Sequence, residues 1–188
     1  MKFALRIVLA AVTLVSGVSF ATSPAIAAPA ECTSHNWYGL IGARYEYFGG
    51  SAGVLGCPTT EELEVSEGRG RIQYFDRGVI TWSPATGPNS VQTLWKAGNG
   101  QLLFDWYTTD PLNYNDWLLN VRFNGTDRGL DREMPVGQNF DVFRTAGRTA
   151  IGTVGSGSYR VAVEGCDRSG GGTHTCRQGW TNPLYLMY

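Results

Sequence analysis

The chain carries little charge and no cluster of basic residues. Lys and Arg number 15 and Asp and Glu number 16 among 188 residues, which gives a formal net charge of −1. Loss of Lys2 and Arg6 with an N-terminal leader would leave the remainder slightly more acidic. Domains that bind nucleic acid usually present a basic patch. We therefore expect no nucleic-acid partner.

Long apolar runs and two common catalytic motifs are also missing. The apolar stretch at residues 7–15 is shorter than the roughly 20 residues that a membrane-spanning helix needs, and no later stretch is longer. The sequence contains neither H-E-x-x-H nor G-x-x-x-x-G-K, the patterns of zinc proteases and phosphate-binding loops. Nothing in the sequence pairs its acidic residues for glycoside hydrolysis. We expect no membrane span in the mature chain, no enzyme activity and no cofactor.

The N-terminus has the composition of a secretory signal peptide. Lys2 and Arg6 precede the apolar stretch, and small residues follow in the A-x-A pattern of Ala25-Ile26-Ala27. Residues 1–27 are therefore predicted to be a signal peptide, with cleavage after Ala27 or after Ala30 both open. A lipoprotein is disfavoured, because Glu31 precedes Cys32 where a lipoprotein needs a small residue. The predicted destination is secretion.

All four cysteines lie after this leader. An even number of cysteines in an exported protein indicates disulfides, and three pairings are possible. We favour Cys32–Cys57 and Cys166–Cys176, because each is local to one half of the chain. The alternative is a metal site that uses His174 beside Cys176. It is disfavoured, since no C-x-x-C occurs and the chain has only one other histidine, His35.

Glycine is abundant at 25 residues, and 15 residues are Trp or Tyr, as in turn-rich β proteins. After a linker at residues 28–37, a first unit spans residues 38–92. It has apolar residues at helical spacing over 38–48, a stop at Gly49-Gly50 and strands at 71–75 and 78–82. A second unit, residues 93–188, has strand patterns at 101–107, 116–123, 139–144, 159–164 and 183–188. We expect a mainly β protein: a small module with one short helix and short strands, followed by a disulfide-closed antiparallel β-sandwich.

Two local features of the second unit carry sharper expectations. The Cys166–Cys176 loop places Gly170-Gly171-Gly172 at a hairpin tip. Tyr159 enters a strand as the tyrosine of a tyrosine corner does, with its hydroxyl able to bond to upstream backbone. Otherwise the unit resembles fibronectin type III and immunoglobulin-like sandwiches only faintly, which says little about function.

The first unit contains a specific set of residues in order: Ile41-Gly42, Gly49-Gly50, Leu55-Gly56-Cys57-Pro58-Thr59, Glu62, Gly68-Arg69-Gly70-Arg71, Tyr74-Phe75, Gly78-Val79-Ile80 and Trp82-Ser83-Pro84-Ala85-Thr86-Gly87. Over residues 41–95 this set resembles the LGFP repeat of actinobacterial exported proteins. Cys57 stands where the repeat has its phenylalanine, and one copy is present where the family usually carries several. The resemblance implies association with the cell envelope.

Three residues of this unit are the candidate ligand contacts: Arg71, Tyr74 and Trp82. An aromatic face can stack on a sugar ring, and an arginine can bind a carboxylate or phosphate; the alternative is that each packs on a strand face. In the second unit, Trp106, Trp117 and Trp180 could form an aromatic platform, although at least two are expected in the core. Oxygen-bearing side chains crowd one further loop, where a turn is favoured over a calcium site: Asp110, Asn113, Asn115 and Asp116.

The sequence thus favours a non-catalytic exported protein that associates with the envelope through its LGFP-like module. The expected partner is cell-wall polysaccharide or peptidoglycan, with an envelope protein as a further possibility. Two alternatives stay open. One is a secreted hydrolase of wall glycans or esters, and the other is a secreted protein-interaction domain.

Overall fold

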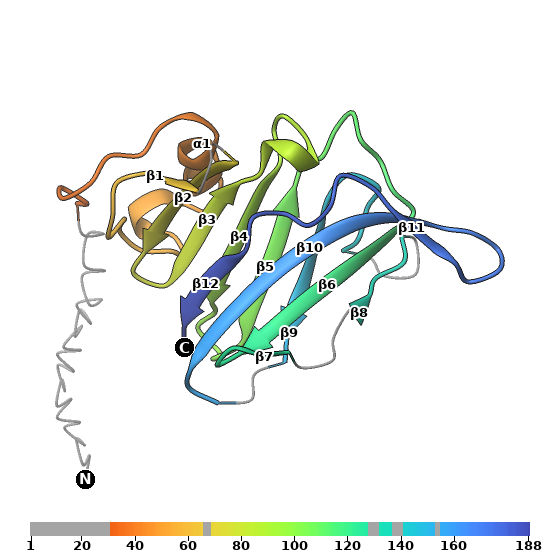
Figure 1. The fold of residues 1–188 in the computed structure, drawn as a ribbon. Helices are drawn as coiled ribbons and strands as arrows, with labels where there is room; N and C mark the ends of the chain where they lie inside the picture. The colour runs from red at the N-terminus through yellow and green to blue at the C-terminus, as the bar shows by residue number, and fades with distance from the viewer. Residues whose placement is uncertain (1–30, 66–68, 128–131, 137–140, 153–154) are drawn as a thin grey trace, which may run out of the picture.

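The computed structural model describes residues 31–188 except 66–68, 128–131, 137–140 and 153–154. The predicted signal peptide at residues 1–27 lies outside the described residues. The described chain is mainly β, as the sequence predicted, and its strands form two sheets (Figure 1). Among the described helices, none has the length and apolar character needed to cross a membrane.

The first sheet, sheet A, is antiparallel throughout. Its strands in spatial order are β1 (Leu63–Val65), β2 (Gly70–Phe75), β3 (Gly78–Trp82), β4 (Val91–Lys96), β5 (Leu102–Tyr107) and β9 (Gly147–Ile151). A two-residue turn at Asp76-Arg77 joins β2 to β3. Two short 3₁₀ helices lie within the described residues, η1 (Gly50–Ala52) and η3 (Pro84–Thr86), and η3 connects β3 to β4.

The second sheet, sheet B, is built around one long strand pair. β6 (Asp116–Phe123) and β10 (Ser158–Arg168) pair along the whole of β6. The shorter strands β7 (Thr126–Asp127) and β8 (Arg132–Glu133) pair with β6, whereas β11 (His174–Cys176) and β12 (Leu184–Met187) pair with β10. The tyrosine corner is confirmed, because the Tyr159 hydroxyl donates a 2.9 Å hydrogen bond to the Gly155 carbonyl.

The main core lies between the two sheets. Alternate residues of sheet A, such as Ile72, Val79 and Phe104, pack in the same buried cluster as Trp117 and Val161 of sheet B. Strand alternation explains why these residues and not their neighbours face sheet B, since residues two apart in a strand face the same side of the sheet. The sandwich therefore draws its two sheets from both of the predicted units.

The boundary that the sequence placed between residues 92 and 93 lies inside β4. β4 pairs with β3 on one side and with β5 on the other, so sheet A continues across that boundary. The C-terminal segment also returns to the first unit. The backbone N–H of Asn182 donates to Ser83 Oγ at 2.9 Å, and its side chain donates to the Trp82 carbonyl at 3.1 Å.

The helix α1 (Gly39–Tyr47) covers the opposite face of sheet A from sheet B (Figure 1). Ile41 and Tyr45 face inward, and the Tyr45 ring stacks on Phe75 with centroids 4.8 Å apart. Buried sheet residues Ile80 and Trp95 complete this second core. The predicted helix is confirmed, and it ends where Gly49 adopts a left-handed φ of 94°.

Both predicted disulfides are confirmed, Cys32–Cys57 and Cys166–Cys176. The first ties the segment before α1 to the loop that precedes β1. The second joins residues that lie directly opposite each other on β10 and β11, and Gly172 donates to Ser169 at the tip of this hairpin. The described part of the chain contains no free cysteine.

The strand predicted at residues 139–144 is wrong for its described part, residues 141–144. Val142 forms only an isolated bridge to Gly147, and the Phe143 N–H donates to the Ala146 carbonyl at 2.8 Å. The backbone thus turns back on itself after Phe143, and the strand of sheet A begins at Gly147 instead. Residues 139 and 140 lie outside the described residues.

Candidate functional site

A pocket of about 800 Å³ opens between α1 and one edge of sheet A. One wall is a stripe of α1 residues at positions i, i+3, i+4 and i+7: Leu40, Ala43, Arg44 and Tyr47. The rest of the lining comes from the start of β4, the end of β5, the turn before β9 and β9 itself, and includes Asn89, Val91, Asp105, Trp106, Tyr107, Asp141, Phe143 and Arg148.

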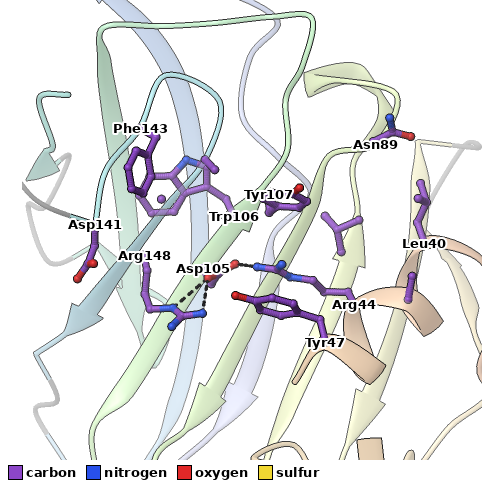
Figure 2. A pocket seen from close by; sticks show the side chains of 14 residues that line it. Leu40, Arg44, Tyr47, Asn89, Asp105, Trp106, Tyr107, Asp141, Phe143 and Arg148 are labelled. Carbon is purple, nitrogen blue, oxygen red and sulfur yellow. Dashed lines mark hydrogen bonds and ion pairs between the residues drawn. The ribbon is translucent and has the colours of Figure 1, made fainter. Parts of the chain in front are cut away.

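A buried carboxylate between two arginines forms the floor of this pocket (Figure 2). The Asp105 side chain is 8% exposed, and its Oδ1 accepts a hydrogen bond from Nη2 of Arg44, whose side chain is also 8% exposed. Its Oδ2 accepts a 3.0 Å hydrogen bond from Nε of Arg148 and lies 2.9 Å from Nη2 of the same residue. Both carboxylate oxygens are therefore engaged by guanidinium groups.

Strand alternation and register place these charges. Because Phe104 and Trp106 of β5 pack into the inter-sheet core, the intervening Asp105 points to the α1 side of sheet A. Arg148 is the register partner of Asp105 on β9. Gly147, next to it, leaves room for the Trp106 indole, since a Cβ at Gly147 would lie 2.2 Å from that ring.

Aromatic rings surround the ion pairs. The Arg44 guanidinium lies 4.6 Å from the ring centre of Tyr47 and 5.0 Å from that of Tyr107, and Figure 2 shows it between the two rings. Tyr47 is 68% exposed, Tyr107 52% and Phe143 59%. These rings combine exposed apolar faces with a fixed, charged floor.

Burial sets the protonation behaviour of Arg44. It lowers the pKa of the guanidinium from 12.5 to about 10, with nearby Arg148 acting in the same direction and the phenols of Tyr47 and Tyr107 opposing it. Arg44 therefore keeps its charge at neutral pH. The charged lining residues comprise two arginines and two aspartates, Asp105 and Asp141, so their formal charges balance.

Residues 55–97 match the family model of the LGFP repeat. This match is consistent with the single LGFP repeat that the sequence predicted. No curated protein matches the chain. The repeat corresponds to β1–β4 of sheet A together with the loop that precedes them, and it supplies Asn89 and Val91 to the pocket.

The motif residues of the LGFP repeat hold its own fold together. Leu55 is buried under α1, and Gly56 has a positive φ of 75° where a Cβ would lie 2.7 Å from Asp76 Oδ2. The same Asp76 oxygen accepts a 2.8 Å hydrogen bond from the Cys57 N–H. In the W-S-P-A-T-G segment, the buried Ser83 hydroxyl donates to Gln92 Oε1 at 2.7 Å.

The structure brings two of the three candidate ligand contacts in the LGFP repeat together and places the third on the opposite face of the sheet. Arg71 and Trp82 are register partners on β2 and β3, whereas Tyr74 packs toward the inter-sheet core. Arg71 forms an ion pair with Glu62 at 3.2 Å, and the Trp82 indole donates to the Pro88 carbonyl at 2.9 Å. Burial raises the pKa of the Tyr74 phenol.

The tryptophan platform is likewise divided. Trp106 and Trp117 are each 1% exposed in the inter-sheet core, which confirms that at least two of the three are core residues, and Trp180 is 39% exposed.

The sequence did not predict the aromatic and charged lining of the pocket, namely Tyr47, Tyr107, Phe143 and both arginines. The four-residue stripe on α1 was the one available signal, since it combines Leu40 and Tyr47 with a cation.

One segment has the residue spacing of a catalytic serine motif but a different structural setting. Gly49-Gly50-Ser51-Ala52-Gly53 has the spacing G-x-S-x-G, which marks a nucleophile when it forms a strand-to-helix turn. Here it follows helix α1 and contains η1. The described contacts of the two histidines go to carboxylates, with His35 next to Glu61 and His174 next to Asp116 and Glu133. The segment therefore lacks the setting of a nucleophile elbow.

Proposed function

We propose that this protein is a non-catalytic exported protein of the cell envelope, and that its pocket beside α1 binds a wall glycan. The observation that carries the proposal is the group of exposed rings around the buried Arg44–Asp105–Arg148 network. The LGFP repeat supports envelope association, and two disulfides fit an oxidising compartment.

A sugar is the ligand class that this lining suits. The pocket volume of about 800 Å³ falls within the range of about 300–1,000 Å³ typical of small-molecule sites. Aromatic faces stack on the apolar faces of sugar rings, and Arg148, with a side chain 41% exposed, can donate to hydroxyl oxygens. Balanced lining charges favour a neutral or weakly charged glycan over a strongly anionic one.

The state of Asp105 supports binding rather than hydrolysis. A glycosidase needs one carboxyl group that donates a proton and another that acts as a base or nucleophile. Both oxygens of Asp105 instead hold arginine side chains. In this proposal Asp105 fixes the arrangement of the rings, and Arg71, Tyr74 and Trp82 serve mainly to pack the LGFP repeat.

The test is retention of the purified protein on isolated wall material. Tyr107→Ala combined with Phe143→Ala should leave the fold intact, because both side chains are exposed. Each stacking contact contributes about 0.5–1.5 kcal/mol, so the double variant should bind roughly 5- to 150-fold more weakly. A matched control combines Tyr38→Ala with Tyr185→Ala, which are 55% and 45% exposed outside the pocket.

Three outcomes would contradict the proposal. Equal retention of the pocket and control variants would remove the pocket as the binding site. Lysis of wall substrate in a zymogram would favour the hydrolase alternative. Crosslinking to a protein, with no retention on purified glycan, would favour an interaction domain.

A further inference from the structure

A second group of polar side chains lies at one end of sheet B, where three strands begin or end. Asp116 is the first residue of β6, Glu133 the last of β8 and His174 the first of β11. His174 Nδ1 lies 2.8 Å from Asp116 Oδ2, and His174 Nε2 lies 3.0 Å from Glu133 Oε1. One ligand atom from each residue can be chosen so that all three lie within 4.8 Å of one another.

Asp116 is the unusual member of this group. Its side chain is fully buried, yet neither carboxylate oxygen has a hydrogen-bond partner among the described residues. The contact with His174 Nδ1 is close but is not aligned as a hydrogen bond, since that nitrogen also lacks a partner within the described part of the chain. A buried carboxylate without hydrogen bonds is costly unless a cation compensates it.

We propose that Asp116, Glu133 and His174 bind one divalent transition-metal ion of the zinc class. Imidazole nitrogen together with carboxylate oxygen is a donor set that zinc accepts, whereas calcium and magnesium prefer oxygen ligands alone. Three protein ligands leave a fourth position of a tetrahedral ion for water.

The three side chains lie close together, and binding one ion requires a further movement. In a tetrahedral site with bonds of about 2.0–2.2 Å, the ligand atoms lie about 3.4 Å apart. The three atoms here lie within 4.8 Å of one another, so the group has to close by up to roughly 1.4 Å. Glu133 makes this adjustment, because its side chain is the most exposed of the three at 45%. Its other oxygen, Oε2, lies 3.1 Å from Arg168 Nη1, which supports the carboxylate from the solvent side.

The neighbouring disulfide holds the ligands in place before the ion binds. Cys166 on β10 lies opposite Asp116 of β6 and also opposite Cys176 of β11. The covalent bond between Cys166 and Cys176 therefore fixes β11 two residues from His174. In the sequence analysis, a disulfide at Cys176 and a metal site at His174 were alternatives. In this proposal the two occur together, and the disulfide positions the metal ligand.

The experiment is calorimetric titration of the oxidised protein with ZnCl₂, accompanied by NMR of the histidine rings. The chain has two histidines, so zinc should shift the ring signals of His174 and leave those of His35 in place. One equivalent should bind. Loss of a second-sphere partner already weakens metal binding about 10–100-fold, so Glu133→Gln and Asp116→Asn should each weaken it at least tenfold.

His35→Gln is the matched control, because His35 also lies beside a carboxylate, Glu61 at 3.3 Å. It should bind zinc like the parent protein. Glu133→Gln alters an exposed side chain, so it tests the site even if Asp116→Asn fails to fold. Absence of zinc binding, or binding that Glu133→Gln leaves unchanged, would overturn the proposal and make the Asp116–His174 contact a simple ion pair. Wall retention by the metal-free protein would be unaffected either way, which separates this site from the glycan pocket.

Discussion

Arg148 of β9 lies directly opposite Asp105 of β5, and its Nε donates a 3.0 Å hydrogen bond to Asp105 Oδ2. Arg44 of α1 binds the other oxygen of the same carboxylate. One aspartate thus joins the helix to the edge strand of sheet A. The two arginines differ in burial, with side chains 8% and 41% exposed for Arg44 and Arg148.

This difference predicts unequal losses of stability. Asp105→Asn should lower the free energy of unfolding by about 3–5 kcal/mol, because it leaves the buried Arg44 charge without its partner. Arg148→Gln should cost about 1 kcal/mol or less, since solvent screens the more exposed pair. Urea denaturation of both variants measures the difference, and equal losses would contradict it.

Alkaline pH should destabilise the protein through its buried phenols. Burial is the main cause that raises the pKa of Tyr45 and of Tyr114 above the ordinary value of 10.0. The folded state therefore keeps these protons at pH values where the unfolded chain loses them. The resulting stabilisation is complete below pH 10 and falls as the pH rises through the folded-state pKa.

The pH effect can be measured as the free energy of unfolding between pH 8 and pH 11. Tyr45→Phe should reduce the slope above pH 10, although it also removes the 2.9 Å hydrogen bond to the Gly56 carbonyl. Tyr38→Phe, at an exposed position, serves as the control and should leave the slope unchanged. A slope equal in all three proteins would refute the assignment.

The two disulfides should differ slightly in their contribution. Cys32–Cys57 spans 25 positions and Cys166–Cys176 spans 10. In the chain-entropy description, a loop of this size contributes about 3 kcal/mol, and the longer loop contributes about 0.8 kcal/mol more. Thermal and urea unfolding of the two paired Cys→Ser variants should therefore show a lower melting temperature and a lower free energy of unfolding for the Cys32/Cys57 variant than for the Cys166/Cys176 variant.

Gly147→Ala should disturb the pocket floor. The added Cβ would lie 2.2 Å from the Trp106 indole, a rigid ring packed in the inter-sheet core. Overpacking of this kind costs about 1–3 kcal/mol. Gly152→Ala is the matched control just beyond β9, because a Cβ there would meet nothing within 4 Å. Equal melting temperatures for the two variants would contradict the prediction.

The elements that the sequence predicted are those with local signals. The helical spacing over Ile41 and Tyr45, the two strands around Asp76-Arg77 and both disulfides were correct. β4 was missed because the turn residues just before it, Ser83 to Pro88, have the composition of a segment that ends a unit. The division after residue 92 followed from that interpretation.

The pocket depends on contacts that no local pattern contains. Arg44 and Asp105 are 61 positions apart, and Asp105 and Arg148 are 43 apart. Their meeting requires the register of β5 with β9 and the docking of α1 on sheet A. Tyr74 lies apart from Arg71 and Trp82 for a related reason. Residues 71 and 74 of a strand face opposite sides, so spacing alone argued against a shared surface.

The continuity of sheet A bears on whether this LGFP repeat can fold when it is separated from the rest of the chain. Residues 55–97, separated from the rest, would expose Ile72, Val79 and Leu94 to water, because these side chains are buried in the core shared with sheet B. β4 would also lose β5 and become an open edge. In this chain the second half of the molecule buries the apolar face of the repeat, as a neighbouring subunit would. A fusion protein that contains the repeat therefore also has to contain β5 and sheet B.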